Sequence, residues 1–534
     1  MKRLISILLA AVMVLSLSAC GGSSASSAPA SGSGDASSAP ASSSAATNPA
    51  TQGTIYGLDR ADTMVLGMVS DIKGLDPMLC STRLENSMVH MHICDTLGWR
   101  DDQGIVTPRL AKSWEMIDDT TWQFVLQEGV VAHDGSKLTS EDVKYSMERC
   151  MSDPSFAQYQ LPAQVGLEEV VIIDELTFQF KLKAPTNVMD FWLFEAPILP
   201  KSYYEGKTSD QLDGACGYGP YKLVEWVRDD HVTLEAFEDY WQGAPQIKNV
   251  VFRVIPEESA RINELLAGSI DFAEQISIDI ADQANSDFTH LDAREGLRKL
   301  QLTMSIEKGN PALKDVRVRQ ALNYAVDKES ICENILSGYT SPYSSYVNPA
   351  NNNPALKAYP YDPEKAKALL AEAGYAEGLE LKLVSPSSRY GLDKEVTMQM
   401  AADLEAVGVK VTCEYMELGV FLEKLDAREL TDLVWIGWAA LVNPVVENLI
   451  LTTGHVDNSA TYSNPEFDAL YQQLASSMDK EEQQKLNFQM QEIVWNDCPW
   501  LFGWKLPQLH GVNNRVEWDI RCDGYFDVFN AKLV

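Results

Sequence analysis

The chain has 534 residues, of which 45% are hydrophobic and 22% are charged. These are ordinary globular values, and the length predicts about three or four domains with a large core. Asp and Glu number 76 against 43 Lys and Arg, which gives a net charge of −33. That charge argues against a nucleic-acid partner and against a basic membrane-surface protein. The longest mostly apolar run, residues 4–17, is shorter than a typical spanning helix, so a polytopic membrane protein is excluded.

The first twenty residues have the layout of a secretory signal peptide. Lys2 and Arg3 form a positive start, residues 4–17 are apolar, and small residues lead into Cys20. The sequence LSAC that ends at Cys20 resembles a bacterial lipobox. The resemblance implies cleavage after residue 19 and lipidation of Cys20. Ordinary secretion with a chance cysteine at this place is the alternative.

Residues 21–54 consist almost entirely of Ser, Ala, Gly, Pro and Thr, with Asp35 as the only charge. Such a segment has no apolar surface to bury, and we expect residues 20–54 to form a disordered tether. A lipid anchor and a tether predict a folded body at the cell surface, on the outer face of the bacterial cytoplasmic membrane. In a cell with an outer membrane this location is the periplasm.

Eight cysteines follow the lipobox cysteine, far apart and without any C-x-x-C pair, so zinc-site spacing is absent. The predicted compartment permits disulfides, but spacing alone does not assign them. A core of this size favours free, buried thiols.

Alternating side chains predict mainly strands in the first half of the body. Residues 63–70 form an opening strand, and residues 113–116 and 122–126 flank a turn, which is a hairpin signal. Thr139 and Asp142 form a capping-box pattern before a helix. Further strands are predicted within 170–182 and at 221–227, 231–236, 250–255 and 269–273, with a helix at 258–267.

Helix-capping residues are the clearest signals in the second half. Asp315 and Asp327 precede two successive helical patterns. Asp362 precedes Pro363, and Gly374 follows the last apolar position of that helix, with proline at the start and glycine at the end as usual. A strand at 379–384, a helix through 398–406 and a strand at 409–414 follow. This alternation predicts an α/β lobe.

Five groups of short stretches lie in one order across nearly the whole body. They are 111–115 with 129–143, 217–221 with 239–241, 267–271, 316–327 with 338–339, and 361–374. Together they resemble signature segments of the oligopeptide, dipeptide and nickel solute-binding proteins of ABC importers (solute-binding protein family 5), and their common order makes the joint signal strong.

The resemblance implies an α/β, two-lobed periplasmic-binding-protein-like fold with a hinge and a cleft, plus an extra α+β domain inserted in the first lobe. The lobes are expected to close over a ligand by hinge motion about chain crossings near residues 298 and 505. The predicted divisions are 1–19 (signal peptide), 20–54 (lipidated Cys20 and tether), 55–93, 214–298 and 506–534 (lobe I), 94–213 (inserted domain) and 299–505 (lobe II).

The resemblance also indicates ligand-binding residues. In peptide binders of this family the ligand lies extended and pairs with main-chain groups, which is a form of strand addition. Residues 432–444 resemble the segment on one side of the peptide. By that match Gly437, Trp438 and Ala439 supply backbone groups and an aromatic wall. Trp435 is a second aromatic candidate, and ordinary core packing is the alternative for both tryptophans.

The sequence departs from the family after Trp438. Peptide binders often have an acidic residue there that pairs with the peptide's amino terminus, whereas this chain has Ala, Leu and Val at 440–442 and then Asn443. A buried unpaired ammonium is costly, so the departure weakens the expectation of a free-amine peptide. Asn443 could hydrogen-bond an amine or a carbonyl, or it could form a turn before Pro444.

Residues 80–86 (CSTRLEN) occupy a segment that touches ligand in the family. Arg83 could pair a ligand carboxylate bidentately. A solvated arginine at the start of a helix is the alternative.

Catalysis finds little support in the sequence. H-E-x-x-H, phosphate-loop and nucleophile-elbow motifs are absent. His90 and His92 would diverge on the helix expected there, so no metal site is predicted. His133 matches a structural turn of the family. We therefore expect no enzyme activity and no cofactor.

These observations predict a monomeric, lipid-anchored receptor that captures a peptide or other small solute and delivers it to an ABC transporter permease with its ATPase. A nickel chelate, an opine or a sugar is the alternative cargo. A sensory or structural lipoprotein without transport is a second alternative. A secreted hydrolase is a third, but it would need a nucleophile–base pair that the sequence does not show.

Overall fold

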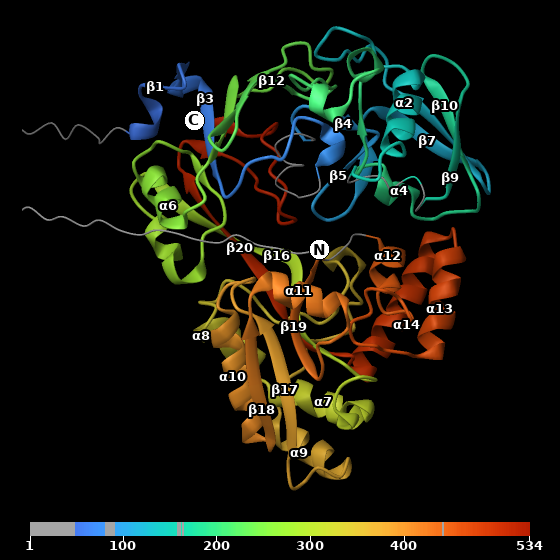
Figure 1. The fold of residues 1–534 in the computed structure, drawn as a ribbon, viewed down its shortest axis with the longest axis vertical. Coiled ribbons are helices and arrows are strands. Elements are labelled where there is room, and N and C mark those ends of the chain that lie inside the picture. The colour runs from blue at the N-terminus through green and yellow to red at the C-terminus, as the bar shows by residue number, and fades with distance from the viewer. Residues whose placement is uncertain (1–47, 81–90, 157–161, 163–164, 440–442) are drawn as a thin grey trace, which may run out of the picture. The chain divides into compact units, whose positions relative to one another are not determined.

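The computed structural model describes residues 48–80, 91–156, 162, 165–439 and 443–534 (Figure 1). The predicted signal peptide, Cys20 and most of the predicted tether lie outside these residues. Of the helices in the described ranges, none combines the length and the apolar character that crossing a membrane requires.

Residues 48–54, which the sequence places in the tether, have defined structure. Asn48 caps a short 3-10 helix, η1 (Pro49–Thr51), and its side-chain nitrogen donates to Asn513 Oδ1 at 2.7 Å. Ala50 is fully buried, and a Cβ on Gly268 would lie 2.6 Å from the Ala50 nitrogen. The prediction of disorder through residue 54 was therefore wrong for residues 48–54, because a small side chain and a missing one allow close backbone packing.

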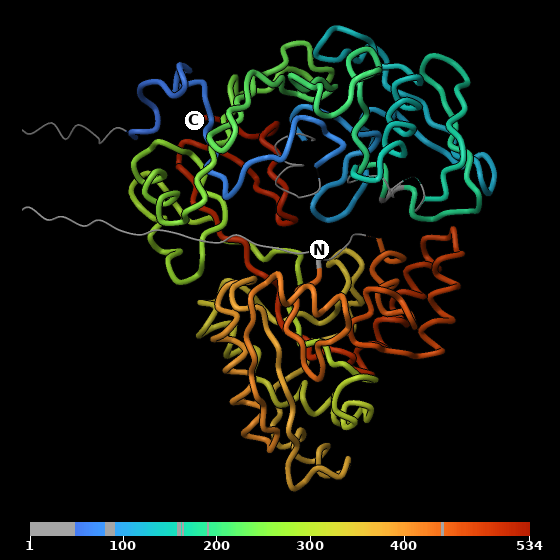
Figure 2. Tube along the Cα trace, viewed as in Figure 1, coloured from blue at the N-terminus to red at the C-terminus, as the bar shows by residue number. Residues whose placement is uncertain are grey.

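One ten-stranded sheet runs through both lobes, in the order β12-β13-β14-β3-β15-β20-β16-β19-β17-β18 (Figures 1 and 2). Its strands are β3 (Thr63–Met68), β12 (Tyr221–Val227), β13 (His231–Ala236), β14 (Asn249–Val254), β15 (Phe272–Ala273), β16 (Thr289–Met304), β17 (Leu379–Pro386), β18 (Val409–Met416), β19 (Leu433–Ala439) and β20 (Trp500–Asn513). The predicted strands of both halves are confirmed. The long strands β16 and β20 are adjacent in the middle of the sheet and belong to both lobes, so the predicted two-lobed α/β fold is present.

The register between β16 and β20 changes where the chain passes from one lobe to the other. Residues 289–295 of β16 pair with residues 513–507 of β20, and the register then shifts between Glu295 and Lys299. From Arg298 onward β16 also pairs with β19. The shift lies where the sequence predicts the crossings, near 298 and 505. Its action as a hinge stays a prediction.

Helices cover the second lobe, and the predicted caps are confirmed. Asp315, Asp327 and Asp362 each accept a backbone N–H within 3.0 Å at a helix start. The helices of this lobe are α7 (Val316–Ala325), α8 (Lys328–Asn334), α9 (Pro363–Glu372), α10 (Asp393–Ala406), α11 (Leu418–Asp426), α12 (Pro444–Leu449), α13 (Pro465–Ser476) and α14 (Lys480–Asp497). The first lobe contributes α6 (Glu258–Leu266), as predicted.

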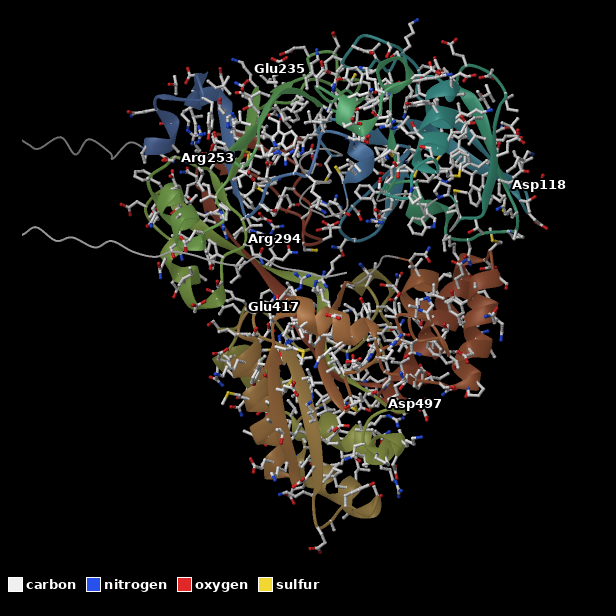
Figure 3. The ribbon with its side chains drawn as sticks, in the orientation of Figure 1. Asp118, Glu235, Arg253, Arg294, Glu417 and Asp497 are labelled. Carbon is white, nitrogen blue, oxygen red and sulfur yellow. The ribbon has the colours of Figure 1, made fainter. Side chains whose placement is uncertain are left out.

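A second sheet, in the order β7-β8-β10-β9, forms the predicted inserted α+β part. Its strands are β7 (Ala111–Asp118), β8 (Thr121–Leu126), β9 (Leu167–Ile172) and β10 (Thr177–Leu182), and α2 (Ser140–Cys150) lies against β9. Asp118, labelled in Figure 3, ends β7 at the turn of the predicted hairpin. Thr139 and Asp142 form the predicted capping box. Stacked Phe124 and Phe178 fill the core of this part.

Short elements connect these units. They are β1 (Thr54–Ile55), β2 (Leu58–Asp59), β4 (Asp95–Thr96), β5 (Gly98–Arg100), β6 (Val106–Pro108), β11 (Pro197–Ile198), β21 (Val516–Glu517), β22 (Lys532–Leu533), α4 (Met189–Trp192) and α5 (Lys201–Tyr204). The 3-10 helices besides η1 are η2 (Arg60–Asp62), η3 (Pro77–Leu79), η5 (Ser209–Gln211), η6 (Ile278–Ala284), η7 (Pro311–Lys314) and η8 (Pro349–Asn351). All eight cysteines after Cys20 are thiols in the described ranges and six are buried, which confirms that prediction.

A buried charge cluster joins the two ends of the body to the first lobe. The Asp271 carboxylate accepts hydrogen bonds from both Arg60 and Arg515 at 2.7–3.1 Å and from the backbone N–H of Val65 at 2.8 Å. Asp271 is fully buried, and both arginines are nearly so. Because one carboxylate compensates two guanidinium groups, the cluster depends on Asp271.

Asp271→Asn should lower the free energy of unfolding by about 3–5 kcal/mol, because it leaves two buried cations without their counter-charge. The measurement is urea unfolding followed by tryptophan fluorescence. Asp62→Asn breaks the exposed pair with Lys248 (2.6 Å) in the same lobe and should cost far less, because solvent screens exposed ion pairs. Equal losses in the two variants would contradict this account.

Candidate functional site

A cavity of about 420 Å³ lies between the inserted part and the second lobe. Five side-chain amides, one lysine and one glutamate line it, together with apolar surface that includes Val106 and Pro444. This lining suits a polar ligand that is held by hydrogen bonds. The lining residues are Gly104, Val106, Asn351, Asn443, Pro444, Lys480, Glu481, Gln483, Gln484 and Asn487.

Helix starts place the polar groups of this cavity. Asn443 is the N-cap of α12, where its Oδ1 accepts from the N–H of Val445 at 2.9 Å. Asp479 caps α14 in the same way, which puts Lys480 and its neighbours on the first turns facing the cavity. The expected turn before Pro444 is therefore present as a helix cap, and Asn443 also lines the cavity.

Hydrogen bonds among the amides make the wall rigid. Asn487 donates to the backbone oxygen of Asn351 at 2.9 Å, and its own oxygen accepts from Asn448 at 2.9 Å. Gln483 donates to the backbone oxygen of Ser477 at 2.6 Å. These side chains are thus held in place before any ligand arrives.

A buried lysine and a buried glutamate connect this wall to the crossing strands. Lys299 of β16 donates to the backbone oxygen of Val347, and Glu447 of α12 accepts from the N–H of Asn348 and from Asn351 Nδ2 at 2.9 Å. Burial lowers the pKa of Lys299 and raises that of Glu447, while their mutual attraction opposes both shifts. The pair links the cavity wall to the predicted hinge.

Trp438 lies on β19 directly opposite Lys299. Its ring is half-buried, and its indole N–H has no hydrogen-bond partner in the described part of the chain. The ladder between β19 and β17 stops at Val434, whereas the ladder with β16 continues to Ala439. Beyond Val434, β19 therefore has no strand partner on its β17 side among the described residues.

Close packing accounts for Gly437. A Cβ there would lie 2.6 Å from Leu300 Cδ2 and 3.0 Å from Tyr390 Cε1. Its carbonyl oxygen already accepts from Arg298 Nη1 at 2.9 Å. Ala439 is the last residue of β19. Arg83 and residues 440–442 lie outside the described residues.

Trp435 is a core residue. It is fully buried, its indole N–H donates to Asp393 Oδ1 at 2.8 Å, and its ring packs on Trp504 at 5.3 Å between ring centroids. With no exposed surface, Trp435 cannot form a ligand wall in this conformation. Of the two predicted tryptophans, the structure leaves Trp438 as the candidate.

Histidine positions indicate structural roles. His133 contacts the backbone of Gly217 and Gly219, and burial lowers its pKa to about 4. His92 packs against Tyr221 and Phe252. His90 lies outside the described residues. In the ranges that are described, no three His, Cys, Asp or Glu side chains gather as a metal site would require.

Sequence reasoning missed most of the cavity wall. Asn351 and the residues of α14 belong to no local motif. They are far apart in the sequence, and nothing near them distinguishes them from surface amides. The Lys299–Glu447 pair was equally invisible, because 148 residues separate its members and nothing local marks either one as buried.

Comparisons with known proteins agree on one family. Residues 106–460 match the model of the bacterial extracellular solute-binding proteins, family 5. The chain is 30% identical over 444 residues to heme-binding protein A of Haemophilus influenzae, covering 76% of this chain and 79% of that protein. It is 29% identical to the dipeptide-binding protein of Escherichia coli, covering 84% and 90%. The fold resembles the ABC transporter substrate-binding protein CtaP from Listeria monocytogenes, with a TM-score of 0.79 and 22% identity over 88% of this chain and 99% of that chain.

The geometry of Trp435 predicts a specific loss of stability. Trp435→Phe should lower the free energy of unfolding by about 1–3 kcal/mol, since the buried Asp393 oxygen loses its donor. Trp500 is an equally buried tryptophan whose indole N–H has no partner in the described residues. Trp500→Phe should therefore cost less, and urea unfolding of both variants tests the difference. A larger loss for Trp500→Phe would show that the Asp393 contact is unimportant.

Proposed function

This chain belongs to the bacterial extracellular solute-binding proteins of family 5, and we propose that it captures a peptide between its two lobes and delivers it to the permease of an ABC transporter. The chain itself carries out no chemistry in this proposal. It acts as a monomer, and lipidated Cys20 anchors it to the outer face of the cytoplasmic membrane. The lipobox-like sequence before Cys20 supports the anchor.

The open edge of β19 beside Trp438 carries the peptide proposal. An extended peptide can add to an unpaired strand edge through main-chain hydrogen bonds, which gives affinity with little dependence on side chains. The half-buried ring of Trp438 would pack against the peptide. The nearby amide wall would take polar side chains of the same ligand.

A ligand at this place would bias the lobes toward closure. Trp438 pairs with Lys299 on β16, close to the register shift at the predicted hinge. A ligand that contacts both lobes binds the closed state more strongly than the open one, and this difference shifts the equilibrium. The permease would then distinguish the loaded receptor from the empty one.

A non-peptide cargo is the second candidate. Among the relatives, one is named for heme and another for dipeptides. The amide-rich cavity also suits a sugar or an opine, because amides hydrogen-bond hydroxyl and carboxylate groups without requiring a charge.

The first test is a thermal-shift screen of residues 48–534 with di- to octapeptides, amino acids, sugars, opines and nickel chelates. A ligand that binds only the native state raises the melting temperature with concentration. We expect peptides to raise it. A response to another class alone would change the cargo, and the absence of any response would favour a role outside transport.

The second test places the ligand. Trp438→Ala should weaken the binding of a peptide found in the screen at least tenfold, equivalent to about 1.4 kcal/mol, as measured by calorimetry. Trp114→Ala removes a half-buried tryptophan from β7 of the inserted sheet and should leave the affinity unchanged. Unchanged affinity in Trp438→Ala would remove that residue from the site.

A further inference from the structure

Three carboxylates lie where the parallel strands of the first lobe end. β3 pairs with both β14 and β15 in parallel, so the three strands end at the same edge. Asp71 follows β3, Glu258 begins α6 after β14, and Glu274 comes directly after β15. In open α/β sheets, ligands bind outside the carboxyl ends of such strands.

This edge faces the strands that cross between the lobes. β15 runs antiparallel to β20, with Phe272 opposite Val512 and Ala273 opposite Gly511. The end of β15 therefore points along β20 toward residues 505–507, where the β16–β20 register shifts. A group placed at the end of β15 lies on the first-lobe side of the proposed ligand cleft.

Two of the three carboxylates are fully engaged within the protein. The Asp71 oxygens accept from the N–H groups of Ile72 and Asp229 and from the Trp226 indole at 2.7–3.0 Å. Both Glu258 oxygens accept from Ser277, one from its N–H and one from its hydroxyl. These carboxylates hold loops in place and have no open oxygen.

Glu274 differs from them. Its N–H donates to Gly67 O at 2.9 Å, and its Oε2 accepts from Val69 N at 2.8 Å, so it continues the β3 ladder. Its Oε1 accepts no hydrogen bond from the described residues and keeps some contact with solvent, although the residue is only 8% exposed. A carboxylate this deeply buried is costly unless a cation or a donor compensates it.

The surrounding charges compensate the Glu274 carboxylate only in part. Arg261 of α6 is near, but its donors point at the carbonyl oxygens of Ile255, Pro256, Glu274 and Gln275. His510 of β20 accepts from Gln275 N through Nδ1, and burial lowers its pKa to about 4, so it is neutral. Arg294 on β16, labelled in Figure 3, pairs with Asp292 and Asp519 instead. No cation of the described residues forms an ion pair with Glu274.

We propose that Glu274 receives an ammonium group of the ligand, so that the cargo is an amine-bearing molecule with its cationic end on the first lobe. This inference rests on the proposed function, since it uses the same cleft. An ammonium N–H would donate to Oε1 and form a charge-assisted hydrogen bond. The peptide amino terminus and a lysine side chain share this chemistry.

The proposal has a defined pH signature. Burial raises the pKa of Glu274 to about 7, and Arg261 only partly opposes this. A bound ammonium favours the charged carboxylate and lowers that pKa again, so affinity should rise as the pH rises through about 7 and fall below it. Glu258 and Asp71 are the other acidic groups at this edge. The Lys299–Glu447 pair also titrates in this region and makes the variant comparison necessary.

The test compares Glu274→Gln with Glu258→Gln by calorimetry between pH 5.5 and 8. The glutamine at 274 can still accept from Val69 N, so the fold should persist, and unliganded melting temperatures check this. The ligands are di- to octapeptides with free or acetylated amino termini, and simple primary amines. Each lysine-containing peptide is compared with a second peptide in which norleucine replaces the lysine. Glu258→Gln removes a nearby charge whose oxygens are already engaged.

We expect Glu274→Gln to weaken free-amine ligands at least tenfold, to leave neutral ones unchanged and to flatten the pH dependence, whereas Glu258→Gln should behave as wild type. Acetylation and the lysine–norleucine pairs then show which ammonium is bound. Equal wild-type affinity for a peptide and for its form with both an acetylated amino terminus and norleucine in place of lysine would overturn the proposal while the peptide receptor stands. Unchanged binding in Glu274→Gln would do the same. Wild type that binds no peptide but binds amines through Glu274 would keep this inference and change the proposed cargo. Binding of neither class would overturn both.

Discussion

The antiparallel ladder between β16 and β20 is the constraint on which both lobes depend. The first-lobe strands continue the main sheet from β20, and the second-lobe strands continue it from β16. The ladder changes register between Glu295 and Lys299, and Gly296 allows the close approach, since a Cβ there would lie 2.6 Å from Leu506 O. A ladder in regular register would resist bending. A ladder with a register shift has fewer inter-strand hydrogen bonds at the shift, so less is lost when the strands bend there. The same two strands can therefore hold the lobes together and let them move.

The site around this ladder uses polar groups that are fixed in advance. Asn487 and Gln483 of the cavity wall donate to backbone oxygens, and Lys299 and Glu447 bind the loop at 347–351. The wall therefore loses little conformational entropy when a ligand arrives. Buried charges of this kind add little net stability, but removing one partner is expensive. Lys299 lies on β16 and Glu447 on α12, so the same contacts hold the cavity wall and the predicted hinge. A movement of the hinge would therefore shift the cavity wall.

The two sides of the cleft offer different chemistry. On the second lobe, the open edge of β19 and the amide wall provide neutral hydrogen-bonding groups, and residues 439–443 contain no carboxylate. On the first lobe, Glu274 has an open oxygen at the end of β15, whereas Asp71 and Glu258 are engaged. An extended ligand with a charged end and a neutral, hydrogen-bonding body fits this division. In the proposal, the charge that holds such an end would belong to the opposite lobe from the one where the family pattern places it.

The sequence by itself determined the local elements and the family. The caps at Asp315, Asp327 and Asp362, the capping box at Thr139 and the hairpin between β7 and β8 are set by residues within a few positions of each other. Only the tertiary structure decided which groups face the cleft. Trp435 and Trp438 have the same local pattern, but contacts with Asp393 and Trp504 bury the first. Asn351, Asn443 and Asn487 meet through long-range packing. Both oxygens of Asp71 accept hydrogen bonds from distant segments, whereas only one oxygen of Glu274 does. Such differences depend on strand register and on contacts between distant segments, which no short stretch of sequence encodes.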